Sequence, residues 1–355
     1  MTRIDDRTLN RTTLARQLLL SRSPMAAADA VGHLVGLQAQ FVNAPYLGLW
    51  ARLSSFALDD LTALLADRTV VRSSVLRGTQ HLVRGDDYGW LRPLVAPTLA
   101  RGRQASFGKQ TAGLDLDALV AHATELLSGR TLTRPLLGAA LAERWPGYDP
   151  IVLGWCAQSL VAVVHPPPSG TWRRGGATPF ALASDWLGER PVVHGPEELV
   201  RRYLAAFGPA TVADVQQWSG VRGLAEVVER MSLVSLGNGL LDLPDMTYES
   251  DVDAPVRFLP DFDNLMIAYA DRSRVLPDEY RKRVCVGGAM VLATVLVDGT
   301  VRGTWKLVLG KEEATLTVTL FEKLARADQA EVEAEAVRLL DFAAADLERR
   351  ELVWA

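Results

Sequence analysis

The chain has 355 residues, 48% of them apolar, and a formal net charge of −4. No stretch approaches the ~20 consecutive apolar residues of a membrane-spanning helix, so the composition predicts a globular protein of two or three domains and excludes a membrane span. The N-terminus has acids before any apolar core, and the two cysteines, Cys156 and Cys285, lie far apart in apolar runs. Both features predict an unsecreted protein with buried thiols in a reducing cytoplasm.

The charge pattern is less decisive than the net charge. A negative total disfavours a nucleic-acid partner, but the acids gather near the C-terminus. Only five of the 38 basic residues are lysines. Arginine is the better reader of phosphates and bases, because its planar guanidinium can donate two parallel hydrogen bonds. The composition is therefore compatible with a basic inner face.

The first informative stretch follows a helix start. A first helix is expected over residues 10–22, and Ser23 followed by Pro24 predicts a second helix over residues 24–35. Gln38 continues the apolar stripe of this second helix. An amide in such a position must have its hydrogen bonds satisfied, because an unpaired buried amide is costly.

Gln40 follows two residues after Gln38, and two interpretations stay open. If the helix ends near Leu37, extended chain points both amides into one cleft floor. If it runs on to Phe41, the two amides diverge by about 200°. A plainer interpretation is that both glutamines cap the helix end and fix the loop that follows.

The rest of the chain shows one theme three times. Helix 58–67 is followed by short strands at 70–77 and 79–83, which is typical of a winged helix. The next unit has helices at 116–127, 131–144 and 149–164, and then a basic, Pro- and Gly-rich tip at 165–176. We expect this tip to be a wing hairpin, which either reaches a partner or only keeps the surface soluble.

The third copy has helices at 197–207, 212–218 and 222–231, and its hairpin at 233–243 carries an Asn-Gly turn. Three helices plus a hairpin, repeated, indicate an architectural repeat. Between the first two units, residues 101–113 are basic and glycine-rich, which predicts a mobile linker that is either solvated or in contact with phosphates.

The C-terminal part is β-rich. Strands are predicted within 284–297 and over 301–309 and 314–321, closed by an amphipathic helix at 328–347 with Glu331 and Glu335 facing solvent. The predicted fold class is α+β: tandem winged-helix units around a concave cleft, plus an antiparallel β-rich unit with a closing helix. The expected boundaries are unit 1 at 1–100, the linker at 101–113, unit 2 at 114–195, unit 3 at 196–254 and the β-rich unit at 255–355.

No metal or cofactor site is expected. The chain lacks cysteine and histidine spacing for zinc. Asp261, Asp263 and Asn264 offer three close oxygens, but without a glycine at the turn they are better interpreted as a structural polar cluster.

Several segments together resemble the winged-helix DNA glycosylases of the AlkZ/YcaQ type. They read His-Leu-Val-Gly-Leu-Gln-Ala-Gln at 33–40, Arg-Gly-Thr-Gln-His-Leu-Val at 77–83, Leu-Pro-Asp-Phe-Asp-Asn at 259–264, Asp-Arg-Ser-Arg at 271–274 and Gly-Thr-Trp-Lys at 303–306. That family's catalytic element is Gln-x-Gln or Gln-x-Asp, and this chain carries the Gln-x-Gln form at Gln38 and Gln40. The resemblance implies a C-shaped arrangement that binds double-stranded DNA.

The implied activity is that of a monofunctional DNA glycosylase. Two neutral amides can position a water but add no strong acid, which suits cationic N7-alkylated purines because these are already good leaving groups. No lysine lies near the motif to form an imine, which favours hydrolysis. Interstrand crosslinks made through N7 are a further expected substrate, in repair or in self-resistance to a DNA-alkylating genotoxin. The rival interpretation is a non-catalytic winged-helix DNA-binding protein or transcriptional regulator.

Beyond the two catalytic glutamines, further residues are expected to line the cleft or bind DNA. His81 either lines the cleft with Arg77 or is a core histidine satisfied by backbone. Asn43 orients the motif loop, binds the lesion strand or forms an ordinary Asx turn before Pro45. A monomer is expected. The full set of cleft or DNA-binding candidates is Asn43, Arg77, Thr79, His81, Trp172, Arg173 and Arg174.

Overall fold

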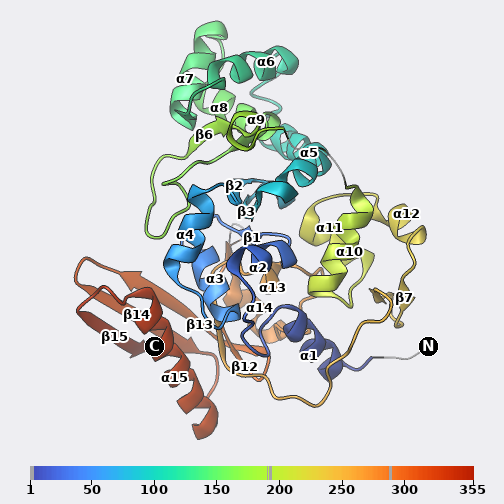
Figure 1. Cartoon of the computed structure of the whole chain (residues 1–355), viewed down its shortest axis with the longest axis vertical. Coiled ribbons are helices and arrows are strands. Elements are labelled where there is room, and N and C mark those ends of the chain that lie inside the picture. The colour runs from blue at the N-terminus through green and yellow to red at the C-terminus, as the bar shows by residue number, and fades with distance from the viewer. Residues whose placement is uncertain (1–3, 190, 192–193, 288–289) are drawn as a thin grey trace.

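The computed structural model describes residues 4–189, 191, 194–287 and 290–355 (Figure 1). It confirms an α+β fold of many helices and several small sheets. The winged-helix assignment of each unit and the unit boundaries remain predictions. None of the described helices is both long and apolar enough to cross a membrane.

The first unit surrounds a small three-stranded sheet with the order β1-β3-β2. Its elements are α1 (Asp6–Arg16), α2 (Ala27–His33), β1 (Leu37–Gln38), α3 (Ala44–Arg52), α4 (Leu58–Ala66), β2 (Val70–Ser74), η1 (Leu76–Gly78) and β3 (Gln80–Arg84). Helix α1 begins earlier than predicted because Asp5 caps it. Helix α2 begins later, because Ser23 is held in a bridge to Leu53 and is not a helix cap.

The predicted linker is wrong in its first half. Helix α5 (Gly85–Phe107) continues through it. Arg103 is buried there and donates to the Thr111 hydroxyl at 3.1 Å. The basic, glycine-rich composition therefore belongs to a largely exposed helix end, anchored at Arg103, which joins the first unit to the second.

The second unit has its own apolar core within residues 114–182. It comprises α6 (Leu116–Leu127), β4 (Leu132–Thr133), α7 (Arg134–Arg144), α8 (Pro150–Leu160), β5 (Val163–Val164), β6 (Pro179–Leu182) and α9 (Ala183–Leu187). Strands β5 and β6 pair antiparallel, so residues 165–178 form the long connection of a hairpin. We call residues 165–178 the basic loop.

The third unit matches its prediction closely. It contains α10 (Pro196–Phe207), α11 (Val212–Ser219) and α12 (Leu224–Glu229), followed by the antiparallel pair β7 (Val234–Ser235) and β8 (Leu241–Asp242). Asn238 and Gly239 lie in the connecting turn with positive φ, as an Asn-Gly turn requires.

The C-terminal unit is a five-stranded sheet in the order β15-β14-β13-β12-β9. Its elements are β9 (Arg257–Leu259), α13 (Asn264–Ile267), η2 (Asp278–Tyr280), α14 (Arg281–Val284), β10 (Cys285–Val286), β11 (Met290–Val291), β12 (Thr294–Val297), β13 (Thr300–Leu309), β14 (Glu313–Leu320), α15 (Arg326–Ala343) and β15 (Arg349–Trp354). The antiparallel prediction fails at one edge, because β15 pairs parallel with β14.

The closing helix α15 also corrects one expectation. Glu335 does not face solvent but is fully buried, where it accepts a hydrogen bond from Arg22 at 2.7 Å. A carboxylate on the inner face of this helix is tolerated because an arginine from the first unit neutralises it.

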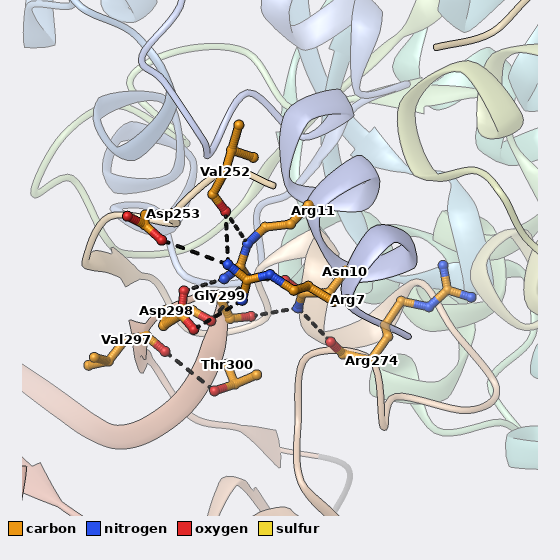
Figure 2. Close-up of polar contacts among 10 residues, drawn as sticks. All are labelled: Arg7, Asn10, Arg11, Val252, Asp253, Arg274, Val297, Asp298, Gly299 and Thr300. Atoms are coloured by element: carbon orange, nitrogen blue, oxygen red, sulfur yellow. Dashed lines mark hydrogen bonds and ion pairs between the residues drawn. The ribbon is translucent and has the colours of Figure 1, made fainter. Parts of the chain in front are cut away.

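Polar contacts tie the N-terminal helix to distant segments (Figure 2). Asn10 donates to the carbonyl of Gly299 at 2.9 Å, and Arg11 donates to that of Val252 at 2.7 Å. Arg11 also pairs with Asp298 in the turn between β12 and β13. One large cluster of buried apolar residues has members in all four units.

One buried ion pair joins helix α3 to the start of helix α13. Both guanidinium nitrogens Nη1 and Nη2 of Arg52 reach the Asp263 carboxylate at 2.8 Å, and both side chains are almost fully buried. The neighbouring Asn264 donates to the carbonyl of Gly36 at 2.7 Å. The predicted structural polar cluster therefore exists, and it fastens the C-terminal unit to the chain just before Gln38.

We predict that Asp263→Ala destabilises the protein by about 3–5 kcal/mol, because it leaves the Arg52 charge buried without its partner. The exposed pair between Arg230 and Glu197 provides the control, since Glu197→Ala should cost only about 0–1 kcal/mol. Thermal unfolding of the two variants measures the difference. Equal midpoints would show that the buried pair does not hold the units together.

Candidate active site

The chain breaks out of helix α2 immediately before the two glutamines. Val35 (φ 55°) and Gly36 (φ 100°) both adopt left-handed conformations. A Cβ at Gly36 would lie 2.8 Å from the carbonyl oxygen of Leu82, so glycine is required there. The turn places Gln38 in strand β1 opposite His81 of strand β3.

The two amides converge. Gln38 Nε2 lies 2.9 Å from Gln40 Oε1 and donates a hydrogen bond to it. Gln38 is 6% exposed, whereas Gln40 is open to solvent. The structure therefore supports the interpretation in which the helix ends early and the extended chain aims both side chains at one place.

Arg77 fixes the direction of this pair. Its Nη2 donates to Gln38 Oε1 at 2.7 Å, and its Nη1 donates to the carbonyl of Trp218 in the third unit. A guanidinium has no acceptor, so the amide oxygen of Gln38 must face it and the amide nitrogen must face Gln40. The order of donors and acceptors thus follows from chemistry and does not depend on how the amides are assigned.

His81 supports Arg77 as a neutral ring. Its Nδ1 donates to the carbonyl of Thr79 at 2.9 Å, which leaves Nε2 as an acceptor 3.4 Å from Arg77 Nη2. Burial, together with the charge of Arg77, lowers the pKa of His81 to about 3. The backbone satisfies His81, as the second interpretation expects, and the ring also contacts Arg77. That the two residues line the cleft remains a prediction. Thr79 contributes its backbone, while its hydroxyl donates to Leu76 at 3.2 Å.

Arg72, which is buried in strand β2, was not among the residues predicted from the sequence. Its Nε and Nη2 donate to the carbonyl of Ala39, between the two glutamines, at 3.1 and 2.9 Å. Its Nη1 donates to Ser169 of the basic loop at 2.9 Å, and Nη2 also contacts Gln80. Desolvation lowers the pKa of Arg72 to about 10. The available signal was a charged residue in an otherwise apolar or small-residue strand.

The basic loop folds back onto the protein and is not a free tip. The Trp172 ring packs against Tyr46 at 5.4 Å between ring centroids. Asn43 accepts a hydrogen bond from the backbone of Arg173 at 2.8 Å, and the Arg173 side chain pairs with Asp346 at 2.8 Å. These internal contacts show that Trp172 and Arg173 anchor the loop, and their contact with DNA remains a prediction.

Arg174 behaves differently from its neighbour. It is exposed, and its guanidinium has no hydrogen-bond or ion-pair partner among the described residues. It lines a cavity of about 530 Å³ that also borders Gln40 and Arg72. On the other side of Phe41, a second cavity of about 640 Å³ is bordered by the C-terminal sheet, with Trp305 and Lys306 in its wall.

Comparisons with known proteins point to one family of enzymes. The family model described as DNA glycosylase AlkZ-like matches residues 31–342. An interstrand DNA cross-link repair glycosylase of Streptomyces sahachiroi is 26% identical over 367 residues, covering 92% of this chain and 93% of that protein. The solved structure of Streptomyces sahachiroi DNA glycosylase AlkZ superposes with a TM-score of 0.81 and 24% identity, covering all of both chains.

The family match begins just before the Gln-x-Gln segment and ends in the closing helix α15. It therefore includes the break after α2, the Arg77 turn, the basic loop and most of the C-terminal sheet. The resemblance predicted from the sequence motifs is confirmed, and the chain belongs to the AlkZ-like family of DNA glycosylases.

Proposed function

We propose that this DNA glycosylase hydrolyses the N-glycosidic bond of cationic N7-alkylated purines in double-stranded DNA, with Gln38 and Gln40 as its catalytic residues. The observation that carries the proposal is the convergence of the two amides, one of which, Gln40, lines an open cavity. The family membership supplies the reaction class, and the neutral chemistry of the pair narrows the substrate.

The leaving group explains why neutral side chains are enough. A purine alkylated at N7 already carries a positive charge, so the electron pair of the breaking C1′–N9 bond neutralises it. No protonation of the base is needed. What remains is a sugar with oxocarbenium character, which needs a water in line with the departing base and dipoles that favour positive charge.

The amide pair provides both features. One hydrogen of Gln38 Nε2 and one lone pair of Gln40 Oε1 remain after their mutual bond, since each atom has a second site. A water can accept from the first and donate to the second, which leaves a lone pair to attack C1′. The water oxygen bonds to C1′ and its spare proton passes to solvent. The negative end of the Gln40 amide faces the developing cation.

We also propose that N7-linked interstrand crosslinks are substrates. A crosslinked base cannot leave the duplex completely, so the catalytic group must reach it at an open surface. Gln40 is exposed rather than enclosed. A relative that is named an interstrand DNA cross-link repair glycosylase supports this extension. Action as a monomer remains a prediction.

The first test is release of N7-methylguanine from duplex DNA under single-turnover conditions. Gln38→Ala and Gln40→Ala should each lower the rate by about 10²-fold, as expected for the loss of one preorganised dipole. Gln217→Ala, an exposed glutamine in α11, is the matched control and should leave the rate unchanged. Unchanged release by both site variants would contradict the catalytic assignment, and no release by the unmodified protein would contradict the proposed function.

The second test is the pH dependence of release. Glutamines do not titrate, the low pKa of His81 (about 3) keeps it neutral, and the pKa of Arg77, lowered by burial to about 10, keeps it charged. The single-turnover rate at saturating protein should therefore be constant between about pH 5.5 and 8.5. A bell-shaped profile, or a tenfold change per pH unit, would show that an ionising acid or base takes part.

A further inference from the structure

The cavity beside Gln40 is lined by charged side chains that have no role in the proposed hydrolysis. One wall is formed by the motif and strands β2 and β3, and the other by the basic loop. Its polar and charged side chains are Gln40, Arg72, Gln80, Ser169, Arg174 and Thr178. None of the lining residues in the described part of the chain carries a carboxylate, so the cavity holds two positive charges without a matching acid.

Arg72 is the clearest sign that the positive charge of this cavity is not balanced. It is 4% exposed, yet every partner found for it is neutral: a carbonyl, a hydroxyl and an amide oxygen. By contrast, the buried Arg52 is paired with the Asp263 carboxylate. A buried cation with only neutral partners is poorly compensated, and an anion in the adjoining cavity would lower its energy.

The basic loop contributes donors on the opposite wall. Arg174 has a free guanidinium, and the hydroxyl of Ser169 accepts from Arg72 but has no acceptor for its own hydrogen among the described contacts. Gly175 and Gly176 border the same cavity, and a Cβ at either would meet nothing within 4 Å. The wall is therefore open enough for a bulky anion to approach.

We propose that this cavity binds one phosphodiester group of the DNA strand that carries the lesion, next to the nucleotide whose sugar faces the glutamines. The inference rests on the proposed function. It identifies the phosphate contact that fixes the position of the DNA strand relative to the two glutamines. The phosphate accepts from Arg174 and Ser169 and lies in the field of Arg72. Phosphate contacts position DNA without reading sequence, so this subsite would place C1′ over the amide pair for any neighbouring base.

The two adjacent arginines of the basic loop thus have separate tasks. Arg173 holds the loop against Asp346 of the C-terminal unit, and Arg174 faces the cavity. Arg173 is already paired with a carboxylate, whereas Arg174 has no ion-pair partner among the described residues. This separation makes Arg174 the residue whose replacement tests the subsite without releasing the loop.

The experiment is a binding cycle with duplexes that carry an uncleavable abasic-site analogue, so that affinity is measured without chemistry. In each duplex, one phosphate near the analogue is replaced by a neutral methylphosphonate. The unmodified protein should lose about tenfold in affinity at one position. Arg174→Gln should lose about as much on the normal duplex and nothing further at that position, because the two changes remove the same interaction.

Arg326→Gln, an exposed arginine at the start of α15, is the matched control and should leave the methylphosphonate profile unchanged. Additive losses for Arg174→Gln at every position, or indifference of the unmodified protein to all of them, would overturn the subsite. Base release from N7-methylguanine DNA is measured in parallel. Release with additive losses overturns only the phosphate subsite, whereas the predicted coupling without release overturns only the proposed hydrolysis.

Discussion

The site depends on one hydrogen bond between two side chains. One side chain can only donate, and the other is an amide that could present either its oxygen or its nitrogen. Arg77 is that donor, and Gln38 is the amide. Without it, the two orientations of Gln38 would be nearly equal in shape, and Gln40 would meet an oxygen as often as a nitrogen. With it, the surface beside the cavity always presents one donor and one acceptor in the same order.

Residues from all four units help to position the contact between Arg77 and Gln38. The Arg77 turn comes from the first unit and is anchored on Trp218 of the third. The second unit supplies the basic loop, and the C-terminal unit supplies Asn264, which holds Gly36 just before the motif. The three other units contact neighbours of the motif: Trp218 contacts Arg77, Ser169 contacts Arg72 and Asn264 contacts Gly36. The precision of the site therefore depends on the packing of the units.

Features that depend on neighbouring residues could be predicted from the sequence. Two-residue spacing implied converging amides once the helix ended, and the Asn-Gly turn fixed the third hairpin. Contacts between residues far apart in the chain could not be predicted from the sequence alone. The burial of Glu335 depends on its ion pair with Arg22, and the anchoring of the basic loop depends on the ion pair between Arg173 and Asp346. The role of Arg72 likewise depends on Ser169, which is 97 positions away.

The most direct measurement compares base release by Arg77→Lys and Arg77→Gln in proteins of matched thermal stability. Lysine also only donates, so it should preserve the order of the amide pair and keep most of the single-turnover rate. Glutamine can present an oxygen to Gln38, so its rate should fall by about tenfold or more, while affinity for DNA changes little. Equal rates for the two variants would contradict the claim that Arg77 orients the catalytic amides.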